Sequence, residues 1–276
     1  MEFSWELAES ILILLLAGSL AGIMAGLLGI GGGIILVPPL VFVFDLMQVS
    51  EAVIPHLAIG TSLATIIATS LSSAKAHLKR GSVDQQLLKY SLIPTSLGAG
   101  FGGFVAGSLS GGVLTMIFGF MAVVVSVRMI IPSNASNEIV HEPNRFLIGN
   151  LTGLTGIISA MVGIGGGALN VPVMSMMGIK MHQAVGTSAS LGFVIALPGS
   201  VGFIVSGWDN PNLPEFSFGF IQWNAALCIC LMTVILAPLG TTISHRLDTK
   251  KLKQVFGIFL LIVAMRTLWR LWSLCL

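Results

Sequence analysis

Long apolar segments alternate with short polar ones along almost the whole chain. Eight apolar runs are long enough to cross a bilayer, which takes about 20 helical residues; they lie near 10–29, 56–78, 87–109, 112–131, 146–163, 184–206, 219–243 and 254–272. Two shorter apolar pieces lie at about 34–44 and 168–177. The runs are apolar around most of the helix circumference, as membrane helices are. The pattern predicts an all-α integral membrane protein.

Composition supports this prediction. The chain has 276 residues, of which 55% are hydrophobic and 9% charged, whereas about a quarter of the residues in a soluble globular domain are charged. A soluble domain is therefore excluded, and the lipid bilayer is the expected surrounding. The formal net charge of +2 gives no reason to expect a nucleic-acid partner.

Three sequence blocks occur twice, in the same order. The pairs are GLLGIGGGIILVP (Gly26–Pro38) with AMVGIGGGALNVP (Ala160–Pro172), HLAIGTSLA (His56–Ala64) with HQAVGTSAS (His182–Ser190), and FGFMAVVVSVR (Phe118–Arg128) with FGIFLLIVAMR (Phe256–Arg266). Such self-similarity indicates two copies of one structural unit. We predict a first repeat at 1–131, a polar cytoplasmic linker at 132–145 and a second repeat at 146–276.

Loop charges predict that the two repeats have inverted topology. The loop after the second long helix is basic in the first half, but its counterpart at 208–215 contains no Lys or Arg. The contrast reverses in the next loop, since 107–112 is uncharged and 245–253 holds four basic residues. By the positive-inside rule, equivalent loops then lie on opposite sides of the membrane. Inversion needs an odd number of crossings, so each half is a glycine-broken helical hairpin plus three full transmembrane helices, with both termini outside.

The glycine clusters break helices where water is absent. Gly31, Gly32 and Gly33 in the first half, and Gly165, Gly166 and Gly167 in the second, allow the backbone to turn, and Pro38 and Pro172 suit the first turn of the short helix that follows. Helix N-termini carry unpaired N–H groups and a partial positive charge. Two of them near the midplane of an inverted-repeat transporter predict an anion site. Close helix packing through glycine is the alternative.

Several polar side chains are candidates to bind the same anion. Four hydroxyl side chains follow Gly60 and Gly186: Thr61, Ser62, Thr187 and Ser188. They could donate hydrogen bonds to an oxyanion, or bond only to carbonyls of their own helix. Asn170 stands where the first repeat has Leu36, and a buried amide needs a partner.

His56 and His182 precede the two G-T-S segments. A histidine can change its charge near neutral pH, so either could couple proton movement to anion movement; a structural or interfacial role is the alternative. We expect no metal and no cofactor. We also expect no catalytic residue, because the long helices contain almost no acidic residues.

The paired GIGGG…VP segments, each followed by an A-[IV]-G-T-S helix start, resemble the TauE/SafE family of sulfite exporter-like membrane permeases over nearly the whole chain. The resemblance implies a permease of the bacterial inner membrane that moves sulfite or another small sulfur-containing or organic anion.

The resulting hypothesis is an alternating-access carrier that exports a small anion, with sulfite or an organosulfonate as the expected substrate. A channel-like anion pore and a carrier of small carboxylates remain as alternatives. An intramembrane enzyme lacks the carboxylate pair or nucleophile it would require, and a structural subunit would not explain two polar-lined breaks. Direction, coupling ion and a homodimeric assembly stay open.

Overall fold

The computed structural model describes residues 5–28, 32–131, 145–243 and 249–275. These residues form ten helices and one short antiparallel ribbon, in the order α1 (Trp5–Leu28), α2 (Gly33–Leu46), α3 (Ile54–Lys79), α4 (Gln85–Ser108), α5 (Gly111–Ile130), α6 (Arg145–Val162), α7 (Gly167–Met176), α8 (Met181–Gly207), β1 (Ser217–Phe218), β2 (Ile221–Gln222), α9 (Trp223–Ile243) and α10 (Thr249–Cys275). The predicted helical fold is confirmed. The ribbon before α9 was not predicted.

Five of the described helices are long and apolar enough to cross a membrane. They are Ala8–Leu27, Ile54–Lys79, Gly111–Ile130, Met181–Gly207 and Trp223–Gly240. The sequence pattern predicted eight such runs. The apolar parts of α6 and α10 are shorter, at Phe146–Val162 and Gln254–Trp269, and α4 has 24 residues but contains several glycines, a lysine and a proline.

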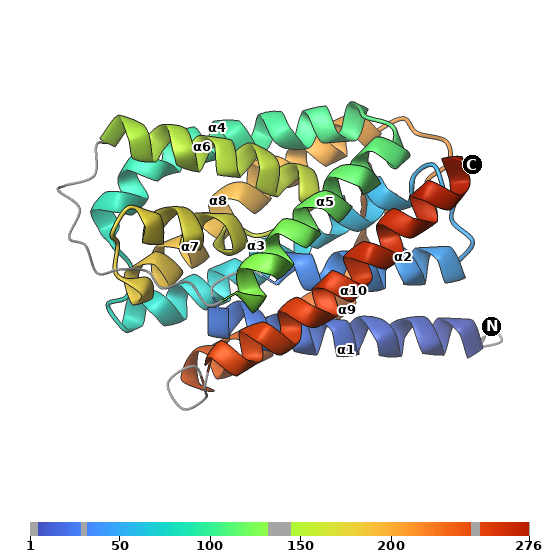
Figure 1. Ribbon diagram of the computed structural model, residues 1–276. Helices are drawn as coiled ribbons and strands as arrows, with labels where there is room; N and C mark the ends of the chain where they lie inside the picture. The colour runs from blue at the N-terminus through green and yellow to red at the C-terminus, as the bar shows by residue number, and fades with distance from the viewer. Residues whose placement is uncertain (1–4, 29–31, 132–144, 244–248, 276) are drawn as a thin grey trace.

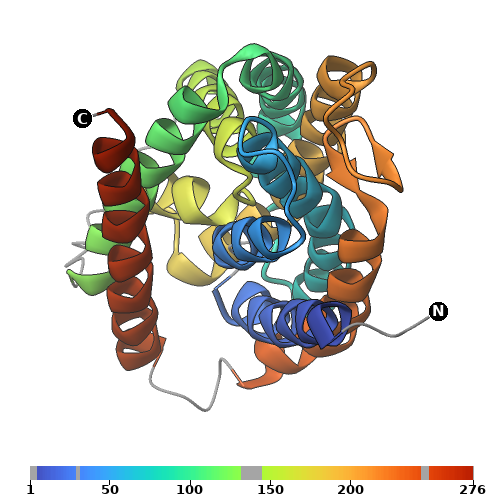
Figure 2. The same ribbon diagram turned by 90° about the vertical axis from the view of Figure 1, so that its right-hand side faces the viewer.

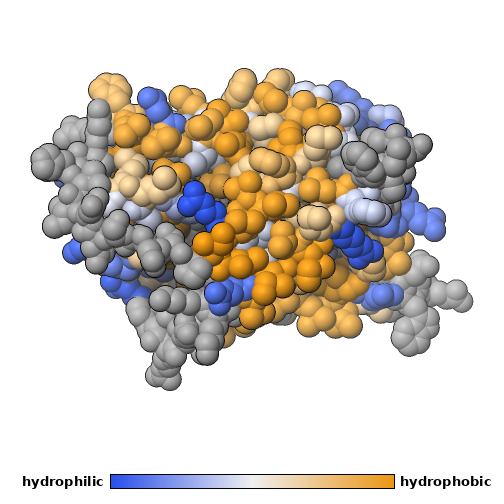
Figure 3. All heavy atoms as spheres, in the orientation of Figure 1, coloured by the Kyte–Doolittle hydropathy of each residue, from blue (hydrophilic) through white to orange (hydrophobic). Residues whose placement is uncertain are grey.

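The surface is that of a protein surrounded by lipid. Many large apolar side chains are more than half exposed, among them Leu97, Phe120 and Ile262, which would be costly in water. Apolar atoms dominate the middle of the face shown in Figure 3, and most hydrophilic atoms lie toward its two ends. The chain is therefore a multi-pass membrane protein.

Two helical hairpins open toward opposite ends of the molecule. In Figure 1 the start of α1, the end of α2 and the end of α10 lie at one end, which we call the terminal end. The α6–α7 hairpin begins and ends at the opposite end. Each hairpin returns to the end from which it started, as the sequence predicted for the glycine-broken pieces.

Helices from the two halves of the chain are interleaved. α1 packs against α9 and α6 packs against α4, while α3 and α8 contact one another at the centre of the molecule. α5 and α10 form a further pair, on the left in the view from the terminal end (Figure 2). Most of the packing surface of each half is therefore supplied by the other half.

Glycines allow these helices to approach closely. A Cβ on Gly98 would lie 2.3 Å from the carbonyl oxygen of Gly153, and one on Gly240 would lie 2.1 Å from that of Ile23. These contacts join α4 to α6 and α9 to α1. Close packing, the alternative reading of the glycine clusters, thus accounts for many glycines elsewhere in the chain.

The predicted position of the prolines is wrong. Pro38 and Pro172 lie inside α2 and α7, five residues after helices that begin at Gly33 and Gly167, and not in the first turn. Both helices start earlier than predicted because the last glycine of each cluster already has helical geometry. Each proline lacks an N–H, so it leaves a carbonyl one turn earlier without its helical partner.

Candidate substrate-binding site

Both glycine clusters interrupt a helix inside the protein. The first break separates α1 from α2. Gly32 at its end is the N-cap residue of α2 and has φ +75°. The second break runs from Gly163, with φ +69°, to Gly166, the N-cap residue of α7. Positive φ is readily adopted only by glycine. Gly31 lies outside the described residues.

The two breaks meet at one buried serine. The Ser62 hydroxyl on α3 lies 3.2 Å from the carbonyl oxygen of Gly33 and 3.0 Å from that of Gly163, so its single proton can be shared between the two acceptors. Gly33 and Gly163 are themselves in contact, since a Cβ on Gly33 would lie 2.2 Å from the Gly163 carbonyl oxygen. Ser62 therefore ties together two backbone segments that are about half the chain apart. We call the region of Gly33, Ser62, Gly163, Gly166 and Asn170 the break site.

The helix N-termini at the break site are buried and have no side-chain cap. The cap residues, Gly32 and Gly166, carry no side chain and so make no side-chain cap hydrogen bond. Gly33, Ile34 and Gly167 at these ends are buried. The first N–H groups of a helix have no partner within it. Both ends are thus electrically suited to a negatively charged group.

Asn170 adds a side-chain donor to this site. Its side chain is completely buried, and its Oδ1 accepts a hydrogen bond from the Thr155 hydroxyl on α6. Its Nδ2 has no hydrogen-bond partner among the described residues. This amide nitrogen lies beside the N-cap of α7, 2.8 Å from where a Cβ of Gly166 would be. A buried donor without a partner is costly, so the Nδ2 of Asn170 has two N–H groups to offer a ligand at the α7 end.

Thr61 and Thr187 occupy matching positions and make matching contacts. The Thr61 hydroxyl accepts from the backbone N–H of Gln222, just before α9, and the Thr187 hydroxyl accepts from that of Asp84, just before α4; both distances are 3.0 Å. The preceding glycines touch the same segments, because a Cβ on Gly60 or Gly186 would lie 2.2 or 2.3 Å from a carbonyl oxygen of the segment. These threonines hold α3 and α8 to the connecting segments of the opposite half.

The remaining predicted residues lie near the α7 end of the break site. Ser188 is buried, with its hydroxyl 3.6 Å from the Met174 sulfur, and its carbonyl oxygen lies 3.4 Å from a Cβ position on Gly166. Gly165 is buried within the second break, and Gly167 is the first residue of α7. The structure thus brings the predicted residues from both halves toward the molecular centre.

The two histidines occupy matching positions in the sequence but have different surroundings in the structure. His56 is buried, its Nε2 lies 2.9 Å from the carbonyl oxygen of Leu109, and its ring stacks on Phe220 with 4.7 Å between centroids. His182 is exposed at the start of α8. Neither belongs to the break site, so the structure gives His56 a packing role at the terminal end of α3.

Replacing Thr61 or Thr187 by valine is expected to lower stability more than it changes substrate affinity. Thr61→Val leaves the buried Gln222 N–H without its acceptor, which costs about 1–3 kcal/mol, and Thr187→Val does the same to the partly buried Asp84 N–H, at a smaller cost. The measurement is thermal unfolding of the purified protein in detergent. Thr69→Val is the control, because the buried Thr69 hydroxyl bonds only to the Thr65 carbonyl of its own helix. Equal melting temperatures in all three variants would contradict the assigned role.

Sequence reasoning missed Gly163 and Thr155. Gly163 is the first glycine of the second GIGGG, and this repetition was the available signal for it. Thr155 had no such signal, because its role depends on α6 and α7 folding against each other so that its hydroxyl reaches Asn170.

No three His, Cys, Asp or Glu side chains among the described residues lie close enough to hold a metal ion. The groups at the break site that could donate to a solute are the backbone N–H groups at the helix ends and the Asn170 amide, because the Ser62 hydroxyl already donates to backbone carbonyls. Such neutral groups bind a solute by hydrogen bonds and helix-end charge, and they leave it able to dissociate.

Comparison with known proteins gives a family that covers nearly the whole chain. The sequence profile of the family described as "Sulfite exporter TauE/SafE" matches residues 14–267. The chain belongs to this family. The resemblance seen in the GIGGG and G-T-S segments is thereby confirmed.

Curated relatives of this TauE/SafE family member are described as probable membrane transporter proteins. One from Haemophilus influenzae is 36% identical over 256 residues, covering 92% of this chain and 96% of its own length. YunE of Bacillus subtilis is 28% identical over 273 residues, with coverages of 92% and 96%, and a relative from Methanocaldococcus jannaschii is 26% identical over 271 residues, with coverages of 95% and 98%. No solved structure matches the chain. The protein is thus a member of a membrane transporter family.

Proposed function

We propose that this protein is an alternating-access carrier that exports a small anion across a bacterial inner membrane, with sulfite or an organosulfonate as the substrate. The family description names sulfite export, and the relatives are described as transporters. The break site supplies the chemistry, because helix N-termini and amide donors favour oxyanions.

One observation carries the proposal: the buried N-terminus of α2 contacts the second break at Gly163, three residues before the N-cap of α7. Gly33 touches Gly163, Ser62 bonds to both carbonyls, and the free Nδ2 of Asn170 lies at the second helix end. A packing role alone would not leave the buried Nδ2 of Asn170 without a hydrogen-bond partner among the described residues. In our proposal the anion binds between these groups, while Thr61 and Thr187 position the helices that carry Ser62 and Ser188.

Alternating access follows from the proposal that the halves are inverted repeats. It is supported by hairpins that open toward opposite ends and by matching pairs of contacts, α1 with α9 and α6 with α4. The matching Thr61 and Thr187 contacts point the same way. Rocking of one such unit against the other would expose a central site to each side in turn.

The membrane potential would favour export. An inside-negative potential lowers the free energy of an outward-moving anion by about 2.3 kcal/mol per charge per 100 mV. Export could then proceed without a coupling ion, whereas import would require one. Proton coupling through His56 or His182 remains a proposal, although neither lies at the break site.

Flux into and out of proteoliposomes tests the function. The purified protein is reconstituted, and labelled sulfite, thiosulfate, small sulfonates and small carboxylates are compared with protein-free vesicles. We expect saturable flux of sulfur oxyanions and acceleration by anion on the opposite side of the membrane. Flux that rises linearly with concentration would support the pore instead, and preference for carboxylates would support the other carrier. No flux of any anion would contradict the proposal.

A cysteine introduced at Lys79 is expected to face the cytoplasm and one at Asn212 the exterior. Both positions are exposed. Lys79 is the last residue of α3 and Asn212 follows α8, the equivalent helix of the second half, so inversion places them on opposite sides. The measurement is labelling by a membrane-impermeant maleimide in intact cells, after replacement of the native cysteines. Labelling of both positions from the same side would refute the inverted arrangement.

A further inference from the structure

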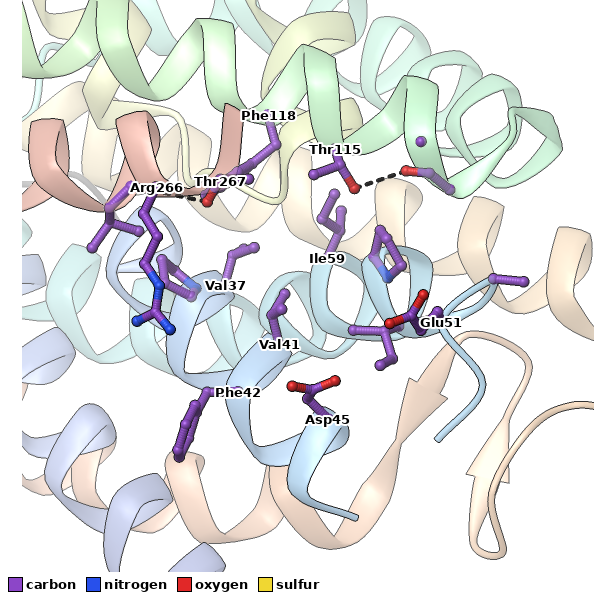
Figure 4. Close-up of a pocket in the computed structure, with 17 residues that line it drawn as sticks. Val37, Val41, Phe42, Asp45, Glu51, Ile59, Thr115, Phe118, Arg266 and Thr267 are labelled. Atoms are coloured by element: carbon purple, nitrogen blue, oxygen red, sulfur yellow. Dashed lines mark hydrogen bonds between the residues drawn. The ribbon is translucent and has the colours of Figure 1, made fainter. Parts of the chain in front are cut away.

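The described residues enclose a cavity of about 520 Å³ at the terminal end. It lies between α2, the start of α3, the start of α5 and the last turns of α10, as Figure 4 shows. Its lining is mostly apolar, with the exposed side chains of Asp45, Glu51 and Arg266 among the lining residues. A water-accessible space of this size is ample for a small hydrated anion.

One residue belongs both to this cavity and to the packing around the break site. Ile59 on α3 lines the cavity, yet only 1% of its surface is exposed. A Cβ on Gly163 would lie 3.1 Å from Ile59 Cγ2 and 3.2 Å from its carbonyl oxygen. Ile59 thus lies between the cavity and the second break.

The other side of the cavity also leads to the break site. Val37 and Pro38 line it, and they lie about one turn along α2 from Gly33. On α3, Ser62 follows Ile59 by three residues, which places it about 4.5 Å further along the helix axis. The distance from the cavity to the break site is therefore about one helical turn on both walls.

We propose that this cavity is the chamber through which the anion passes between the terminal side and the break site, and that Ile59 is the hydrophobic barrier between them. The inference rests on the proposed function. The apolar lining holds no group that would bind an anion tightly, so the solute would pass through without being trapped. The charge of Arg266 is opposed there by those of Asp45 and Glu51, so passage relies on the size of the cavity and not on electrostatic attraction. Passage would require α3 to separate from the second break by movement of Ile59 away from Gly163.

Cysteine modification tests the chamber. Thr115 lines the cavity, and among the described residues its hydroxyl bonds only to the Gly111 carbonyl of its own helix, so Thr115→Cys is a mild change. In a protein whose native cysteines have been replaced by serine, we expect an anionic methanethiosulfonate reagent, added on the terminal side, to label Thr115→Cys and block flux. Met116→Cys is the matched control, since Met116 is the next residue on α5, is 59% exposed and does not line the cavity.

The outcomes separate the chamber from the proposed function. Anion flux by the unlabelled variants is measured first, and its absence for every anion would contradict the function. Two results would overturn the chamber alone. In the first, flux stays normal after complete labelling of Thr115→Cys; in the second, Thr115→Cys is labelled no faster than Met116→Cys. A cavity filled by lipid would give the second of these results.

A second variant tests the barrier. Ile59→Ala removes most of the side chain between the cavity and Gly163. We expect the anion flux measured with no anion on the opposite side of the membrane to rise about tenfold, because rates depend exponentially on barrier height. Ile67→Ala is the control on the same helix, since Ile67 is also an isoleucine packed on the core but does not line the cavity. An unchanged leak in Ile59→Ala, or an equal rise in Ile67→Ala, would overturn the role of Ile59.

Discussion

Gly33→Ala is expected to abolish transport in a protein that still inserts into the membrane. The added methyl group would lie 2.2 Å from the Gly163 carbonyl oxygen and 2.5 Å from Ile66 Cδ1, closer than van der Waals contact allows. The two breaks must therefore move apart, and the Ser62 hydroxyl can no longer reach both carbonyls. A displacement of about 1 Å at a site that positions a substrate can cost about 100-fold in rate, and we expect a loss of at least that size.

The measurement for Gly33→Ala is initial flux per molecule of reconstituted protein, with insertion checked by gel filtration in detergent. Gly100→Ala is the matched control, because the nearest atom to its Cβ would be Pro198 Cβ at an ordinary 3.6 Å. Alanine also favours a helix over glycine, so this control should insert and transport normally. Flux by Gly33→Ala close to that of Gly100→Ala would refute the break site.

Asn170→Asp is expected to stop anion transport with little change in fold. The aspartate side chain has nearly the same shape and retains an oxygen that can accept from Thr155, but it replaces the free Nδ2 donor by a carboxylate oxygen. A negative charge then faces the position that we assign to the anion, in surroundings of low dielectric constant where like charges repel strongly. We expect flux to fall by about 100-fold or more, which corresponds to about 2.7 kcal/mol.

Two further variants sharpen this result. Asn170→Leu introduces the residue that the first repeat has at this position, and it should give a smaller loss because it removes the donor without adding charge. Asn150→Asp places the same charge on an exposed position of α6 and should transport normally. If the site bound a cation, Asn170→Asp would increase the flux of cations. If Asn170→Asp transported anions at the wild-type rate, Asn170 would not belong to the binding site.

Sequence alone predicted where the helices break. Glycine clusters inside long apolar runs conflict with helix propensity, and their repetition in both halves made a local packing accident improbable as an explanation. The structure places breaks at both clusters, and Gly32 and Gly163 have the positive φ that demands glycine. The repeated G-T-S segments likewise marked α3 and α8, the central helices that support the breaks.

The division of roles within those segments could not be predicted. Thr61 and Ser62 are neighbours on one helix, yet Thr61 holds a connecting segment 161 residues later while Ser62 bonds to the breaks. Which of two adjacent hydroxyls faces which partner depends on the rotation of α3 within the bundle. That rotation is set by contacts with α8 and α9, and no local pattern reports it. The contact between Thr155 and Asn170 could not be predicted for the same reason.

The interleaved packing has a consequence for biosynthesis. α1 finds its main neighbour, α9, only after about 200 further residues have been made, and at typical translation rates of roughly 5–20 residues per second this takes about ten seconds or longer. Until then its glycine face, including Gly18 and Gly22, has no α9 to meet. The first half therefore lacks most of its packing partners in the bilayer until the second half has been synthesised. A chain truncated in the middle is expected not to reach the native fold.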